Sequence, residues 1–161
     1  WSDWSSDVCS SDLNEILCHC GKKGCLETEA SGRALYRIVK ERIKAGESSS
    51  LTKTKGNDFT LEDIIDAVNA EDPLCIDVVE RIGYAIGETV ANLINVFNPE
   101  LVVIGGMLAR TGIFLQQAVN ASVRKYTLNL VNKDTRLCLS KLNERGGIIG
   151  ACLLARKIVL G

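Results

Sequence analysis

The sequence predicts a mixed α/β domain in which long helices flank short parallel strands. The run Leu101–Ile104 is short and fully apolar, which is typical of a buried parallel strand. Long amphipathic stretches precede it, at residues 73–97, and follow it, at residues 113–126. A second strand is expected near residues 136–142, and a final helix follows Gly146. This alternation of helix and strand defines the fold class.

Apolar spacing and capping residues predict the helices of the first half. Leu26–Lys44 carries apolar residues three or four apart, which indicates a helix. Residues 45–59 are polar and predict a surface loop or a mobile flap. Thr60 then begins another helix, and Asp63 three positions later makes a variant of the capping box.

The longest helix has clear start and stop signals. Asp72 followed by proline supplies an N-cap and a first helical residue. Asn98 precedes the second proline, which ends the helix. Gly83 and Gly87 lie four residues apart inside it, and each costs roughly 1 kcal/mol in helix propensity. That cost is tolerable where another helix crosses closely at this face.

Composition places the chain among globular domains. At 161 residues, 46% of them apolar, it is about one domain long and can form a proper core. The net charge of −1 offers no basic field for nucleic acid. No signal-peptide pattern and no apolar run of membrane-spanning length is present, so we expect a cytoplasmic protein without a membrane partner. Cys75, Cys138 and Cys152 lie in apolar surroundings and are interpreted as small core residues.

The first thirteen residues differ from the rest of the chain. Ser2–Leu13 has low complexity and no apolar period, and the part from Asp3 onward matches a translated sequencing adaptor. We interpret residues 1–13 as a non-native, disordered scar and residues 14–161 as the native domain. A genuine disordered tail is the alternative.

Three cysteines form the clearest chemical motif. Cys18, Cys20 and Cys25 are soft ligands within eight residues, and the two glycines among them let the loop turn until the sulfurs converge. The spacing predicts a zinc site with thiolate ligands. Free thiols or a disulfide are the alternatives, although a Cys-x-Cys pair closes a strained ring. His19 would point away from the metal, so the motif itself lacks a fourth ligand.

The run from Leu17 to Glu27 resembles the signature of the ROK family, named for repressors, open reading frames and kinases. Its pattern is Cys-x-Cys-Gly-x-x-Gly-Cys-x-Glu. The resemblance implies a fourth zinc ligand from a histidine upstream of the motif, where this chain has none. It also implies that Glu27 binds sugar hydroxyls. A favourable charge near a helix N-terminus is the structural alternative for Glu27.

Two glycines follow the predicted strand at its carboxyl end. Gly105 and Gly106 lie where ligands of open α/β sheets gather, and we assign them to nucleotide binding. A tight strand-to-helix turn is the alternative. Asn92–Gly106 resembles the nucleotide-side segment of the ROK family, and Gly147–Ala151 resembles its closing helix. The resemblance covers residues 14–161 and implies the C-terminal lobe of an actin-like ATPase fold of the sugar-kinase type, with the N-terminal lobe missing.

Two functions follow from the resemblance. One is a sugar-responsive transcriptional regulator that senses a hexose or hexose derivative and contacts DNA only through a missing N-terminal module. The other is an ATP-dependent sugar kinase of the glucokinase or fructokinase type. Residues 27–32 and the polar insert favour the regulator, whereas Gly105 and Gly106 favour the kinase. The family further implies a homo-oligomer. No catalytic residue is assigned, because the general base and the phosphate loop would lie in the missing lobe.

Overall fold

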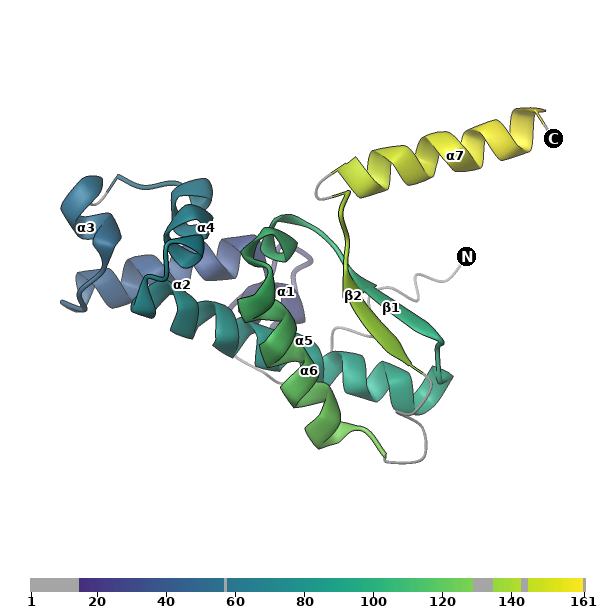
Figure 1. Cartoon of the computed structure of the whole chain (residues 1–161), viewed down its shortest axis with the longest axis horizontal. Helices are drawn as coiled ribbons and strands as arrows, with labels where there is room; N and C mark the ends of the chain where they lie inside the picture. Colours follow the sequence, from purple (N-terminus) through teal and green to yellow (C-terminus); the bar gives the residue numbers. More distant parts are fainter. Residues whose placement is uncertain (1–14, 57, 129–134, 143–144, 161) are drawn as a thin grey trace.

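The computed structural model describes residues 15–56, 58–128, 135–142 and 145–160, so the interpretation of residues 1–13 falls outside the described chain. The elements in chain order are α1 (Leu26–Glu29), α2 (Gly32–Lys44), α3 (Ser50–Thr54), α4 (Leu61–Asn69), α5 (Pro73–Phe97), β1 (Leu101–Ile104), the 3₁₀ helix η1 (Met107–Thr111), α6 (Ile113–Tyr126), β2 (Arg136–Leu139) and α7 (Gly146–Leu160). Figure 1 shows a helical body, a strand pair beside it and α7 projecting from the strand pair.

The predicted helix over residues 26–44 is divided into two. The chain breaks at Ala30 and Ser31, and the Ser31 backbone is extended, with φ of −128°. The Ser31 hydroxyl accepts a hydrogen bond from the backbone N–H of Ala34 at 3.2 Å, which caps α2. A serine at this place competes with helix continuation because its side chain replaces a backbone partner.

The polar insert is packed rather than flap-like. It contains α3, and Leu51 and Phe59 are buried in the core with 4% and 3% exposure. The carboxylate of Asp72 accepts hydrogen bonds from the Ser49 hydroxyl at 2.9 Å and from the backbone N–H of Ser50 at 2.6 Å. The prediction of a loop missed these contacts because they join residues more than twenty positions apart.

The predicted caps of α4 and α5 are confirmed. The Thr60 backbone N–H donates to the Asp63 carboxylate at 2.8 Å, while Asp63 N–H donates to the Thr60 hydroxyl at 3.3 Å. Asp72 accepts from the backbone N–H of Cys75 at 3.0 Å and thereby caps α5. Asn98 ends α5 in the left-handed region, with φ of 44°.

Helix α6 crosses α5 at the two glycines, as their spacing suggested. A Cβ atom on Gly83 would lie 2.6 Å from the Ala118 Cβ, and one on Gly87 would lie 2.5 Å from the Ser122 Cβ. The Ser122 hydroxyl donates to the backbone carbonyl of Tyr84 at 2.8 Å. The backbone of α5 at Gly83 and Gly87 therefore lies directly against α6, and a side chain at either position would meet α6 at less than 3 Å.

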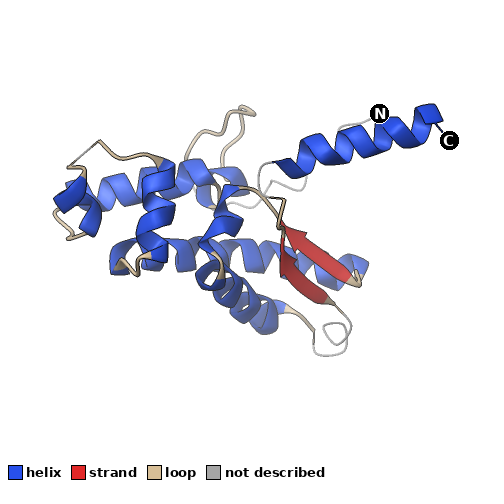
Figure 2. Ribbon diagram, turned by 45° about the horizontal axis from the view of Figure 1, so that its top comes forward, coloured by secondary structure: helices blue, strands red, loops and turns tan. Residues whose placement is uncertain are grey.

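The strands β1 and β2 pair in parallel, from Leu101 with Arg136 to Ile104 with Leu139. One face packs on the core through Val102 and Leu137, among others. The opposite face is open, with Leu101 and Val103 51% and 54% exposed. The sequence predicted a buried strand at residues 101–104, and for one face of the strand pair this prediction is wrong in the described chain. The described helices cover only the other face (Figure 2).

Helix α7 has no layer over it in the described chain. Its apolar residues are largely solvent-exposed, among them Ile158 at 82% and Leu154 at 63%. Of the three cysteines predicted as core residues, Cys75 is buried, Cys138 is half-buried and Cys152 on α7 is exposed. The prediction is therefore wrong for Cys152, because nothing described packs on α7. Within the described residues, no helix has the length and apolarity that crossing a membrane requires.

Candidate functional site

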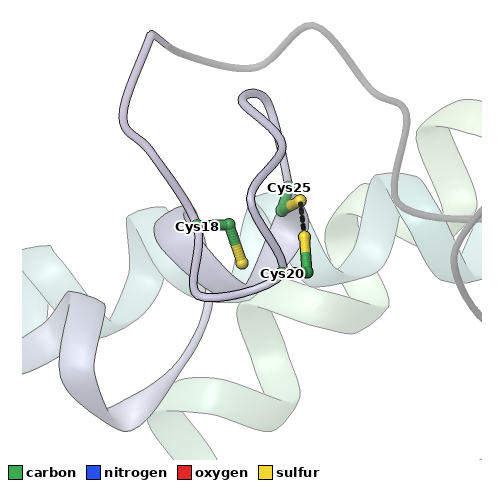
Figure 3. A group of neighbouring side chains, drawn as sticks. All are labelled: Cys18, Cys20 and Cys25. Carbon is green, nitrogen blue, oxygen red and sulfur yellow. Dashed lines mark hydrogen bonds between the residues drawn. The ribbon is translucent and has the colours of Figure 1, made fainter.

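A tight loop brings the three cysteines of the motif together before α1. The backbone turns at Gly21 and Gly24, which both have positive φ, and the Cys18 N–H donates to the Lys22 carbonyl at 2.8 Å. The sulfurs of Cys18, Cys20 and Cys25 all lie within 4.8 Å of one another, and the latter two are 3.4 Å apart (Figure 3). The sequence prediction that these sulfurs converge matches the geometry.

The donor set fits a tetrahedral soft-metal site. Zinc–sulfur bonds of about 2.3 Å place two thiolates of a tetrahedron about 3.8 Å apart. The sulfurs of Cys20 and Cys25 are 3.4 Å apart, and all three sulfurs lie within 4.8 Å of one another, which is compatible with that value. Among the described residues, only these three cysteines form such a group, and His19 does not belong to it. A fourth ligand would therefore come from water or from a residue outside the described chain.

Without a metal, the thiols of Cys20 and Cys25 differ in pKa. A hydrogen bond with the Lys22 backbone lowers the pKa of Cys20, and its contacts with the other two thiols lower it further. The hydrogen bond with Cys20 and burial raise the pKa of Cys25 to about 12. Cys20 is thus the first of these two thiols to become a thiolate, and a bound metal would have to displace the proton from Cys25.

Glu27 lies on α1, two residues after the last cysteine. Cys25 is the N-cap of α1, and the Thr28 hydroxyl donates to the Cys25 carbonyl at 2.6 Å. The cysteine loop therefore determines where α1 begins and where the Glu27 carboxylate stands. Glu27 is exposed.

A cavity of about 430 Å³ joins Glu27 to the predicted nucleotide glycines. Its lining comprises Glu27, Ala30, Ser31, Gly32, Arg33, Leu61, Gly105, Gly106, Met107 and Leu108. Gly106 has φ of 85°, and a Cβ there would meet nothing within 4 Å, so its glycine is required by backbone conformation. Two site segments that are almost eighty positions apart in the sequence thus share one hollow, at the carboxyl end of β1.

A second cavity of about 190 Å³ also includes Glu27. It is lined on one side by the start of the cysteine loop, including His19, and on the other by Arg33 and Arg37 of α2. Sequence reasoning did not select either arginine. The signal was present in their spacing of four residues, which places both on one face of the helix that follows Ser31.

The comparisons with known proteins agree with the motif. A family model described as the ROK family matches residues 9–158, and the chain belongs to this family. A glucokinase of Halalkalibacterium halodurans is 34% identical over 142 residues, which are 87% of this chain and 43% of the glucokinase. NagC of Escherichia coli K12, a DNA-binding transcriptional dual regulator, is 33% identical over 143 residues, which are 89% of this chain and 34% of NagC.

The fold is shared with a solved ROK structure. A ROK family glucokinase from Streptomyces griseus, solved in complex with glucose and AMPPNP, matches with a TM-score of 0.76 and 27% identity. The match covers 88% of this chain and 47% of that structure. The chain spans less than half the length of each of these three proteins. Regulators and kinases are therefore both among its relatives, at nearly the same identity.

Proposed function

We propose that this chain is the hexose-binding part of a cytoplasmic, sugar-responsive transcriptional regulator of the ROK family. The observation that carries the proposal is the cavity of about 430 Å³ with Glu27 at its edge. Its size lies within the usual range for small-molecule sites, roughly 300–1,000 Å³. Its other walls are mainly small or apolar residues and backbone, which suits a ring carrying several hydroxyl groups.

Glu27 would accept hydrogen bonds from sugar hydroxyls. Within the described chain its carboxylate has no ion pair or hydrogen bond, so both oxygens are available to a ligand. Hydrogen bonds to a charged acceptor contribute roughly 1.5–3 kcal/mol each. This explains why an acid, rather than an amide, suits the position.

Zinc would have a structural role in this site. We propose that Cys18, Cys20 and Cys25 hold it as thiolates, with a fourth ligand from outside the described chain. Because Cys25 is the N-cap of α1, a metal on its sulfur would fix the start of the helix that carries Glu27. Zinc supplies rigidity here, and no chemical step is assigned to it.

Residues 27–32 and the polar insert at residues 45–59 favour the regulator. NagC, which is 33% identical across 89% of this chain, is a relative of that class. With a net charge of −1, the chain itself offers little to a DNA backbone. DNA would be bound by sequence that NagC-like proteins have beyond the part matched here.

An ATP-dependent sugar kinase is the second candidate, because Gly105 and Gly106 line the same cavity as Glu27. In that case the glycine turn would approach the nucleotide while Glu27 holds the sugar. The complex of the Streptomyces glucokinase with glucose and AMPPNP supports this alternative. The general base of such a kinase would lie outside this chain, so the chain alone should phosphorylate no sugar.

Substitution of Glu27 tests sugar binding. Glu27→Gln keeps the shape but replaces one acceptor oxygen by a donor, so we expect hexose affinity to fall by at least tenfold in calorimetric titration. Zinc content and melting temperature should stay unchanged. Glu29→Gln, on the same helix, is the matched control and should leave hexose affinity intact. An unchanged hexose affinity with a lowered melting temperature would return Glu27 to a role at the helix N-terminus.

A second pair of assays separates regulator from kinase. The chain is expressed with any coding sequence that precedes it, and is tested for hexose-dependent release of DNA and for hexose-dependent ADP formation. We expect hexose to change the mobility shift of DNA fragments from its own upstream region without ADP formation. Sugar-dependent ADP formation that Glu27→Gln reduces would decide for the kinase.

A further inference from the structure

The single turn α1 carries Glu27 but has little packing of its own. None of its four residues is fully buried, and the turn ends at Ala30. A helix of this length is not stable alone, because its few hydrogen bonds do not offset the entropy of fixing the backbone. The position of the Glu27 carboxylate therefore depends on contacts that hold this turn from outside.

The cysteine loop holds the start of α1. The hydroxyl and the backbone N–H of Thr28 both donate to the Cys25 carbonyl, at 2.6 and 3.0 Å. Cys25 is 1% exposed, so this end of the turn is attached to a buried residue. The carbonyl groups in the last turn of a helix need partners from elsewhere.

Arg37 of α2 supplies such a partner. Its Nη2 donates to the Thr28 carbonyl at 3.0 Å, directly beside Glu27 in the chain, and its Nη1 donates to the Glu41 carboxylate at 3.3 Å. The Arg37 side chain is 34% exposed, so water only partly screens these contacts. A charged donor forms a stronger bond to a carbonyl than a neutral one does. Glu41, four residues later in the same helix, keeps the guanidinium in place.

A second arginine reaches α1 in a weaker way. Arg81 of α5 lies 4.0 Å from the Glu29 carboxylate, and the Arg81 side chain is 69% exposed. An ion pair at this distance and exposure contributes little. The two arginines therefore form a matched pair, since Arg37 binds the backbone of the turn and Arg81 only approaches one of its side chains.

We propose that Arg37 is a positioning residue of the sugar site, which holds the Thr28 carbonyl and thereby keeps Glu27 where it meets the hexose hydroxyls. The inference rests on the proposed role of Glu27. Arg37 and Glu27 also line the same cavity of about 190 Å³. Without the bond, the turn would hold its binding arrangement only part of the time, and the apparent affinity falls with the fraction of protein in that arrangement.

Calorimetric titration with glucose, fructose and N-acetylglucosamine tests the proposal. For the hexose that binds the wild type most tightly, Arg37→Gln should lower the affinity roughly threefold to tenfold, and Arg37→Lys should restore part of the loss. Arg81→Gln is the matched control and should leave the affinity unchanged. An unchanged affinity in Arg37→Gln, or an equal loss in Arg81→Gln, would overturn the proposal.

The double variant separates positioning from direct contact with the sugar. If Arg37 acts through Glu27, Arg37→Gln should cost no further affinity in a protein that already carries Glu27→Gln. An equal loss in both backgrounds would mean that Arg37 binds the sugar itself or supports the whole domain. Either result would contradict a positioning role.

Hydrogen exchange without hexose tests the restraint itself. The Ala30 N–H donates to the Leu26 carbonyl at 2.7 Å and closes the turn. Its exchange should be roughly threefold or more faster in Arg37→Gln, and unchanged in Arg81→Gln, while the amides of α5 keep their wild-type rates in both variants. Unchanged Ala30 exchange in Arg37→Gln would overturn the proposal even if the hexose affinity fell, because that loss would then have another cause.

The two proposals fail in different ways. If Glu27→Gln lowers the hexose affinity and Arg37→Gln does not, only the positioning role is wrong. If the wild type binds none of the three hexoses, or Glu27→Gln leaves the affinity unchanged, the proposed sugar site fails and the positioning role fails with it.

Discussion

The helical body formed by α2, α4, α5 and α6 differs sharply from the end formed by β1, β2 and α7. In the body, large apolar residues such as Ile82 and Leu115 are 1% and 0% exposed. At the other end, Ile158 and Val159 on α7 are 82% and 78% exposed, and Leu101 on β1 is 51% exposed. The two regions have similarly apolar sequences, and only the first buries them.

The pattern within each helix accounts for part of this difference. Helix α4 is amphipathic, with Ile64, Ile65 and Val68 fully buried on one face. Helix α7 is apolar on nearly all sides, which is typical of a helix surrounded by protein. A helix with one apolar face is covered within the described chain, while a helix that is apolar on all sides needs more apolar surface than the described residues supply. Apolar content therefore indicates a need for burial and does not ensure it.

The largest contrast should come from truncating one isoleucine in each region. Ile82→Ala removes a side chain that is 1% exposed, and we expect a loss of about 2–5 kcal/mol in the free energy of unfolding. Ile158→Ala, at 82% exposure, should change it by less than about 0.5 kcal/mol. Urea unfolding followed by circular dichroism measures both. A large loss for Ile158→Ala would show that α7 is packed in solution.

A smaller effect should follow from acid, because the body contains the buried carboxylate of Asp72. Burial raises the pKa of Asp72, but hydrogen bonds from the backbone N–H groups of Ser50 and Cys75 and from the Ser50 and Ser49 hydroxyls outweigh it and lower the pKa from 3.8 to about 2. The contribution of the carboxylate to stability is thus complete above about pH 4–5. It is lost as the pH falls through about 2.

The shift corresponds to about 2 kcal/mol, at 1.36 kcal/mol per pKa unit. Between pH 5 and 2 the free energy of unfolding of the wild type should fall by about this amount more than that of Asp72→Asn. The Asn variant should already be less stable at pH 7. Asp58→Asn, at an exposed position, is the control and should keep the wild-type pH dependence. Parallel pH profiles of the wild type and Asp72→Asn would contradict the assignment.

Local signals in the sequence were sufficient for most element boundaries. The proline after Asp72, the capping pair of Thr60 and Asp63, and the apolar run of β1 each act within a few residues, so their structural effects can be predicted from sequence alone. The convergence of the three cysteine sulfurs was likewise predictable, because the loop is short. Two of the failures were long-range: the hydrogen bonds of Asp72 with Ser49 and Ser50, and the missing cover over Cys152.

The candidate site shows the same division. Glu27 and the glycines Gly105 and Gly106 were predicted separately, and the structure places them in one cavity. Local sequence patterns do not encode that junction, because it depends on where the turn after β1 lies relative to residues 27–33. Arg33 was overlooked because a single exposed arginine at the beginning of a helix carries no sequence signal of its own. Arg33 becomes a candidate only through the two cavities that it lines together with Glu27.

We expect one substitution, glycine to alanine, to have opposite effects on stability in the two regions. In α5, the new Cβ of Gly87→Ala would lie 2.5 Å from the Ser122 Cβ and 2.7 Å from the Val119 carbonyl oxygen, which forces the helices apart. Overpacking costs about 1–3 kcal/mol, while alanine gains about 1 kcal/mol in helix propensity. We expect a net loss of about 1 kcal/mol in the free energy of unfolding.

In α7, Gly150→Ala meets nothing within 4 Å, so only the propensity term remains. Its Cβ should stabilise the helix by up to about 1 kcal/mol, which is visible as slower hydrogen exchange of the amides of residues 146–160. Urea unfolding of Gly87→Ala and exchange of Gly150→Ala should therefore move in opposite directions. A stabilising Gly87→Ala would mean that the α5–α6 crossing has room for a methyl group. A destabilising Gly150→Ala would mean that a close neighbour covers α7 in solution, since only a close neighbour can penalise a methyl group there.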